Sequence, residues 1–170
     1  MKLALTRPSS LMNFGTAYVC TCKIFFSYWH SSQSGFSNVH LGHLCNRPMG
    51  LQNNRLKNHQ MTSSSRWDNF HGPYRARLNI RRHGRHIGAW SSQYNNRYQW
   101  LQVDFRGPAK IIRICTQGRQ DTNQWVTQYF VMHSLTAVNF VPYQERNSIK
   151  VIGTDLKLQG SGLAPLISLS

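Results

Sequence analysis

A short basic cluster is the feature of this sequence with the clearest chemistry. Arg81, Arg82 and Arg85 lie within five residues, with His83 and His86 among them. A planar guanidinium can hold phosphate, sulfate or carboxylate through two parallel hydrogen bonds. Near an anionic membrane each such charge contributes on the order of 1 kcal/mol, and histidines that protonate below about pH 6.5 strengthen the attraction. The cluster predicts binding to a polyanion, and the alternative is a solvated loop with no partner.

Two large aromatic side chains precede this cluster in a polar context. Trp67 and Phe70 lie within Arg66–His71, a run that is followed by Gly72 and Pro73. Aromatic rings at the tip of a loop can enter the interfacial layer of a membrane, because one end is apolar and the other tolerates water. The alternative is that Trp67 folds back onto the end of the domain as a core residue.

Strand-like runs alternate with polar turns through most of the chain after residue 44. The clearest is Gln99–Phe105, in which apolar and polar residues alternate with period two. Lys110–Cys115, Trp125–His133 and Asn139–Tyr143 predict three further strands. The pattern predicts an all-β domain.

The composition favours a binding domain over an enzyme. The chain has 170 residues, of which 40% are hydrophobic, enough for one domain with a core. Lys and Arg number 20 against 5 Asp and Glu, a formal charge of +15 that favours polyanionic partners. With so few carboxylates, and with no nucleophile elbow, phosphate loop or zinc-protease motif, we expect no catalytic residues and no cofactor.

The first 44 residues differ in character from the rest. Residues 1–10 resemble the basic start of a signal peptide, and residues 11–20 resemble a weak apolar region. Polar residues within 11–29 argue against a membrane span. Residues 31–43 are rich in Ser, Gly and His, which is typical of a linker. We therefore expect 1–44 to lie outside the folded domain.

The four cysteines are too few for a small disulfide scaffold. A zinc site is the less favoured interpretation of the first three, because the spacing fits no common zinc finger. Its ligands would be Cys20, Cys22, His40, His43 and Cys45. Cys115 lies in a predicted strand, so its expected role is that of a small buried apolar residue. No metal site is therefore expected.

The chain from Cys45 onward resembles one family in a series of collinear blocks. The blocks are Cys45–Leu51, Asn54–Leu56, Met61–Ser65, Arg75–Asn79, Gly88–Trp90, Gln99–Asp104, Thr116–Arg119, Gln124–Val126 and Asn139–Tyr143. Chance matches do not stay in register over about a hundred residues. Residues 45–150 thus resemble the discoidin domain, also called the coagulation factor V/VIII type C domain, between an extension at 1–44 and a non-matching tail at 151–170.

The resemblance implies a jelly-roll β-sandwich, or distorted barrel, in an extracellular binding module. Such domains grip a phospholipid headgroup, a glycan or a matrix or cell-surface protein such as collagen through three loops, or spikes, at one end. The first spike maps to Arg66–His71, the second to Ile80–His86 and the third to Gln120–Asn123. The implied ligand-binding residues are Arg66, Trp67, Asp68, Asn69, Phe70, His71, Arg81, Arg82, His83, Arg85, His86, Gln120, Asp121, Thr122 and Asn123.

A second group of residues is expected to support the fold. Arg77 and Asp104 are candidates for a half-buried ion pair. Trp90, Trp100 and Trp125 lie in or beside strand patterns, which favours core positions. For Asp121 the commoner role of a turn residue stands beside the ligand-binding one.

The end of the chain departs from the family. Members normally continue with further strands after the position of Tyr143–Glu145, and close with a cysteine that bridges back to the one matched by Cys45. Neither is present here, so we expect a module that is incomplete at its C-terminus. A missing bridge of that kind typically costs about 2–5 kcal/mol.

Two classes of function follow from the sequence. The first is an extracellular adhesion or surface-binding module of discoidin type. The alternative is a basic protein that binds nucleic acid or polyanions in general, which the charge supports and the lack of any nucleic-acid-binding motif opposes. The sequence leaves the ligand class and the oligomeric state open.

Overall fold

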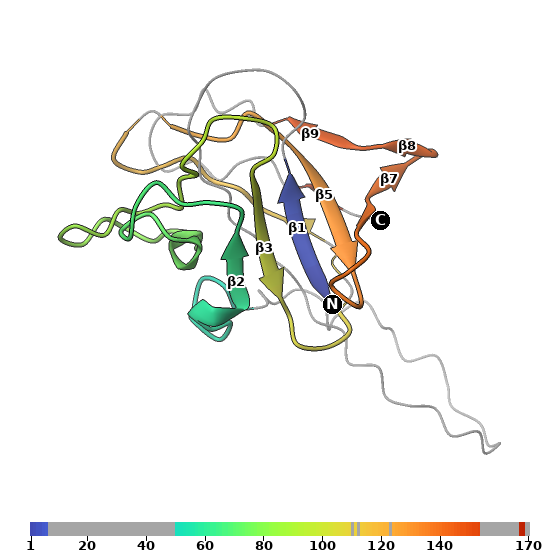
Figure 1. Ribbon diagram of the computed structural model, residues 1–170, viewed down its shortest axis with the longest axis horizontal. Coiled ribbons are helices and arrows are strands. Elements are labelled where there is room, and N and C mark those ends of the chain that lie inside the picture. The colour runs from blue at the N-terminus through green and yellow to red at the C-terminus, as the bar shows by residue number, and fades with distance from the viewer. Residues whose placement is uncertain (7–49, 110, 112, 123, 154–166, 169–170) are drawn as a thin grey trace, which may run out of the picture.

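The structure, a computed structural model, describes residues 1–6, 50–109, 111, 113–122, 124–153 and 167–168. Its largest sheet has six antiparallel strands in the order β2-β3-β1-β5-β6, with β9 also paired to β5 (Figure 1). These strands are β1 (Lys2–Thr6), β2 (Met61–Ser63), β3 (Trp100–Asp104), β5 (Gln128–Ser134), β6 (Val141–Pro142) and β9 (Val151–Gly153).

Two smaller sheets and two short helical turns complete the described part of the chain. β4 (Arg113–Ile114) pairs with β10 (Ile167–Ser168), and β7 (Gln144–Glu145) pairs with β8 (Ser148–Ile149). The helical turns are the 3-10 segments η2 (Asn58–Gln60) and η3 (Pro73–Arg75). The predicted all-β class is therefore confirmed.

None of the helical segments among the described residues is long and apolar enough to cross a membrane.

The strand predicted most clearly from the sequence is β3. Leu101 and Val103 are each 1% exposed, whereas the alternate residues of β3 are half-buried. Phe105, just after the strand, is buried in the same core. The period-two pattern thus places one face of β3 in the core, as expected for a sheet that packs on one side.

The first six residues differ from the sequence expectation. β1 lies between β3 and β5, with Leu5 opposite Leu101 on one side and Val131 on the other. The Leu5 side chain is buried in the core. The sequence pattern predicts this segment outside the domain, because its basic start resembles a signal peptide. Pairing with two strands far along the chain, which no local pattern reveals, fixes it in the sheet instead. Residues 7–44 lie outside the described residues.

The end of the chain also differs from the expected tail. β9 pairs with β5, where Ile152 is buried opposite Tyr129. Ile167 and Ser168 pair with β4. Three residues at the start of 151–170, and two near its end, are thus parts of sheets, while 154–166 lie outside the described residues.

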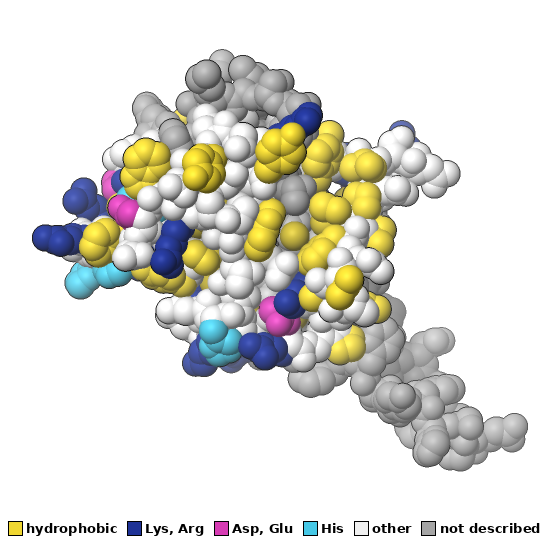
Figure 2. Space-filling model, in the orientation of Figure 1, with side chains coloured by type: hydrophobic (Ala, Val, Ile, Leu, Met, Phe, Trp, Pro, Cys, Tyr) yellow, Lys and Arg dark blue, Asp and Glu magenta, His cyan; other side chains and the backbone are white. Residues whose placement is uncertain are grey.

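The connection between β2 and β3 positions the expected binding loops. It spans residues 64–99 and carries the first and second spikes. Figure 1 shows this connection extending away from the sheet on the side opposite β7 and β8. Lys, Arg and His side chains gather at this end in Figure 2.

Candidate functional site

The second spike is a tight β-hairpin. His83 and His86 pair through two backbone hydrogen bonds, of 2.9 and 3.1 Å, which enclose a two-residue turn. Gly84 has a φ of +58° at the first turn position, and Arg85 follows with a negative φ. This is the pattern of a type II′ hairpin, which favours Gly at that position. The turn holds Arg85 at the exposed tip of the spike.

The base of this hairpin is clamped by Arg75. Its Nε donates to the carbonyl oxygen of Ile87 at 2.6 Å, and its Nη2 donates to that of Arg81 at 2.9 Å. A Cβ at Gly88 would lie 2.7 Å from the carbonyl oxygen of Ile80, so only glycine allows the two sides to approach this closely. The exposed arginines therefore extend from a fixed base.

The first spike is closed by Asp68. Its Oδ1 accepts a hydrogen bond from the backbone N–H of Phe70 at 2.7 Å and pairs with Nδ1 of His71 at 2.5 Å. The hydrogen bond from His71 is the main cause that lowers the pKa of Asp68. Asp68 is thus engaged within the loop. Its neighbour Trp67 is 56% exposed, so the interpretation of Trp67 as a core residue is wrong.

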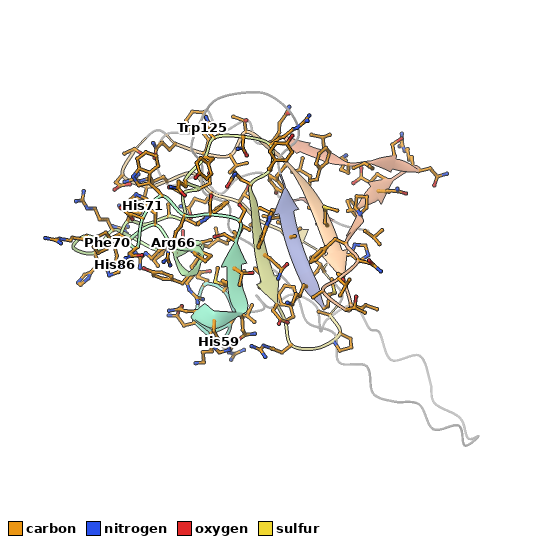
Figure 3. The ribbon with its side chains drawn as sticks, viewed as in Figure 1. His59, Arg66, Phe70, His71, His86 and Trp125 are labelled. Atoms are coloured by element: carbon orange, nitrogen blue, oxygen red, sulfur yellow. The ribbon has the colours of Figure 1, made fainter. Side chains whose placement is uncertain are left out.

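The first and second spikes contact each other. The rings of Phe70 and His86 meet edge to face, with centroids 5.2 Å apart at 76°. The Tyr74 hydroxyl donates to the carbonyl oxygen of Asn69 at 2.8 Å and lies 3.1 Å from Nδ1 of His86. Figure 3 shows Arg66, Phe70, His71 and His86 together at this end of the molecule.

The third spike has its own ion pair. Arg119 holds Asp121 with Nε–Oδ1 at 2.5 Å and Nη2–Oδ2 at 3.1 Å, and donates from Nη1 to Gln124. The Arg119 bond is the main cause that lowers the pKa of Asp121, and the charge of Arg82 acts in the same direction. The charge of Asp121 is therefore neutralised within the loop, which favours the turn role over the ligand-binding one.

The segments that precede the second and third spikes lie side by side. The backbone N–H of Asn79 donates to Oε1 of Gln117 at 3.0 Å, and Leu78 packs with Ile80 and Cys115. The charge of Arg82 in the second spike also acts on Asp121 in the third. Gln120 and Thr122, at the tip of the spike, are exposed. Asn123 lies outside the described residues. The described parts of all three predicted spikes thus belong to one end of the domain.

Comparison with known proteins gives the family. The model of the F5/8 type C domain matches residues 60–160. The chain is a member of the F5/8 type C domain family.

The chain is also similar to curated proteins over part of their length. Porcine coagulation factor V (Sus scrofa) is 36% identical over 111 residues, which are 62% of this chain and 5% of the relative. Rat lactadherin (Rattus norvegicus) is 35% identical over 122 residues, 67% of this chain and 28% of the relative. The chain thus spans about a twentieth of factor V and about a quarter of lactadherin. The resemblance to the discoidin family is confirmed, and with it the general role of a ligand-binding module.

The predicted Arg77–Asp104 ion pair is wrong. Arg77 is 3% exposed and donates to the carbonyl oxygens of Leu51 and Tyr74, at 2.7 and 3.0 Å, and to Oδ1 of Asn58 at 2.8 Å. Asp104 instead accepts from the backbone N–H of Arg106 at 2.8 Å. Backbone oxygens from separate loops satisfy Arg77, and sequence spacing does not reveal such partners.

The predicted core tryptophans have different environments. Trp90 is 5% exposed within the core, and its Nε1 donates to the carbonyl oxygen of Ser65 at 3.0 Å. Trp100 and Trp125 are half-buried and are not among the core cluster, so the core prediction is wrong for these two. Trp100 lies on the half-buried face of β3, and Trp125 precedes β5. Cys45 lies outside the described residues.

A loop beside the first spike was not evident from the sequence pattern. Residues 91–98 carry Tyr94, 55% exposed, and Tyr98, 68% exposed, with the Arg97 guanidinium 5.2 Å from the centroid of the Tyr98 ring. The available signal was two tyrosines among amide side chains directly before the β3 pattern. We call residues 91–98 the tyrosine loop.

Proposed function

We propose that this domain binds membranes containing anionic phospholipid, outside the cell, through its three spikes. The observation that carries the proposal is the exposed Trp67 ring, held at the same end as the arginine hairpin. An aromatic ring enters the interfacial layer, and the arginines attract the negative headgroups. The Trp67 ring and the hairpin arginines are already exposed, so membrane contact does not require the sheet to move.

The electrostatics of this end support an anionic surface as the ligand. Both acidic side chains of the spikes are engaged, Asp68 by His71 and Asp121 by Arg119. Arg81, Arg82 and Arg85 are exposed, and Arg82 donates to the carbonyl oxygen of Gly84 at 3.2 Å. Uncompensated charge of one sign at one end raises the local concentration of a ligand of the opposite sign.

A second candidate is general polyanion binding, which the formal charge of +15 favours. Such binding falls steeply with salt because it releases counterions, and it does not depend on an aromatic ring. Membrane attachment through Trp67 keeps an apolar contribution at moderate salt. Salt dependence therefore separates the two.

The test compares ligands and variants in parallel. Binding of the intact chain is measured to phosphatidylcholine vesicles with and without phosphatidylserine, to heparin, to duplex DNA and to collagen. Trp67→Ala and Arg82→Ala are compared with Arg55→Ala, which removes an exposed charge near η2. We expect phosphatidylserine-dependent binding that each spike variant weakens about fivefold or more, while Arg55→Ala leaves it within twofold.

Three outcomes would contradict the proposal. Equal affinity for heparin and DNA, lost entirely at moderate salt, would show general polyanion binding. Binding to collagen or heparin alone would assign the spikes to a protein or a glycan. Unchanged vesicle binding in both spike variants would remove the spikes as the site.

A further inference from the structure

The tyrosine loop presents an aromatic and cationic surface outside the three spikes. Tyr94 and Tyr98 each expose more than half of their area, and Arg97 lies over the Tyr98 ring. The two tyrosine rings face solvent together with a cation that is already oriented.

A buried amide makes this loop rigid. Gln99 is 6% exposed, and its Oε1 accepts hydrogen bonds from the hydroxyls of Ser64 and Ser65, at 2.9 and 2.5 Å. Its Nε2 donates to Oδ1 of Asn96 at 2.8 Å, and the same oxygen accepts from the backbone N–H of Tyr98 at 3.0 Å. The turn that carries Arg97 and Tyr98 is therefore fixed from within, so little conformational entropy is lost on binding.

The tyrosine loop shares its support with the first spike. The backbone N–H of Gln93 donates to Oγ of Ser65 at 3.0 Å, and that of Trp67 donates to the carbonyl oxygen of Ser91 at 2.8 Å. The indole of Trp90 binds the carbonyl oxygen of Ser65. A ligand that engages Trp67 is thus next to the tyrosine loop.

We propose that the tyrosine loop is a second membrane contact, which lies in the headgroup layer when Trp67 enters the interface. Tyrosine is suited to this layer because its ring is apolar and its hydroxyl remains hydrated. Arg97, ordered by Tyr98, supplies a planar donor for lipid phosphate. The inference rests on the proposed function and extends the site from three loops to four.

The test uses the intact chain and phosphatidylcholine–phosphatidylserine vesicles. The double variant Tyr94→Ala/Tyr98→Ala is compared with Tyr94→Phe/Tyr98→Phe, which retains both rings. Leu135→Ala/Val138→Ala is the matched control, because these side chains are 76% and 79% exposed on the connection between β5 and β6. We expect the alanine pair in the tyrosine loop to weaken binding about three- to tenfold, the phenylalanine pair less than twofold, and the control not at all.

A second readout locates the rings directly. The chain is labelled with 3-fluorotyrosine, and the two ¹⁹F signals of residues 94 and 98 are identified as those that the Tyr94→Phe/Tyr98→Phe variant lacks. Lipid with a nitroxide on its headgroup should broaden both signals in the bound state. Thermal melts of every variant check that the fold is retained.

The outcomes separate this inference from the proposed function. If Trp67→Ala weakens vesicle binding but the tyrosine variants do not, and the ¹⁹F signals stay sharp, the tyrosine loop is not a membrane contact although the proposed function stands. If no variant affects vesicle binding, both fail. If the alanine pair weakens binding to heparin or another glycan and leaves vesicle binding intact, the loop is a glycan site and the inference is wrong.

Discussion

Two sets of arginines, fewer than ten residues apart in the chain, have opposite environments. Arg77 is buried, and its guanidinium donates to two backbone carbonyls and one amide oxygen. Burial, with a contribution from the charge of Arg75, lowers its pKa. Arg82 and Arg85 are exposed on the hairpin. The comparison teaches that the positive charges of this chain do not all have one role, because Arg77 holds loops together while Arg82 and Arg85 are exposed at one end of the domain.

The first strand is also part of the buried interior, and a substitution there is expected to have the largest effect on stability. Leu5 is 4% exposed between Leu101 and Val131. Leu5→Asp places a carboxylate in the core and is expected to lower the free energy of unfolding by about 3 kcal/mol or more. Chemical denaturation measures it, with Thr136→Asp as an exposed control. Equal stability of the two variants would show that β1 is not part of the folded sheet.

Arg77 itself gives the next largest effect. Arg77→Leu removes the donor to the buried carbonyl oxygen of Leu51 and to the partly buried one of Tyr74, which costs about 2–4 kcal/mol. Arg85→Leu is expected to change stability by less than about 0.5 kcal/mol, because the side chain is exposed. Denaturant midpoints of the two variants compare them directly. If both lose the same stability, the division into buried and exposed arginines is wrong.

Substitution of the exposed arginines Arg82 and Arg85 is expected to change membrane affinity instead of stability. Arg82→Ala/Arg85→Ala removes two charges worth on the order of 1 kcal/mol each near an anionic membrane, which corresponds to about thirtyfold weaker binding. Partitioning onto phosphatidylserine vesicles measures this loss. Arg55→Ala/Arg146→Ala, a matched pair of exposed arginines away from the spikes, should leave affinity within about twofold. A loss of the same size in that pair would mean that total charge, and not the hairpin, determines binding.

The smallest expected effect is on the pH dependence of stability, and it comes from substitution of Asp121 in the third spike. The pKa of Asp121 lies below its ordinary value of 3.8, mainly because of its bond to Arg119. A lowered folded-state pKa contributes stability that is fully present above about pH 3.8 and is lost as the pH falls through the folded-state value. Asp121→Asn should therefore cost less than about 1 kcal/mol at pH 7.

The same substitution changes the pH profile. Stability measured from pH 7 to pH 2 should fall less in Asp121→Asn than in the parent below about pH 3.8. Parallel curves for the two proteins would contradict the assigned role of the Arg119–Asp121 pair.

Local pattern was enough to predict part of this molecule. The alternation of Gln99–Phe105 predicts β3 because each residue reports its own face of the sheet, and the order of the family blocks predicts the spikes. It could not predict β1, since Leu5 is placed by strands about a hundred residues away in sequence. The carbonyl partners of Arg77 could not be predicted from the sequence either, because every residue type has a backbone carbonyl.

The exposure of individual aromatic side chains also could not be predicted from the sequence. Trp67 and Trp90 are both tryptophans near turns, yet one is exposed and the other is buried with a partner for its indole N–H. The tertiary position of the loop decides this, and the residue type does not. The tyrosine loop was missed for the same reason.

Tryptophan fluorescence during vesicle binding tests the central claim most directly. The intact chain and Trp67→Phe are titrated with phosphatidylserine vesicles, with and without lipid brominated on its acyl chains. We expect the parent to show a blue shift and quenching by the brominated lipid, and Trp67→Phe to bind with neither change. Equal shift and quenching in both proteins, or binding of the parent without any change in its fluorescence, would contradict insertion of Trp67 and with it the membrane-binding role of this end of the domain.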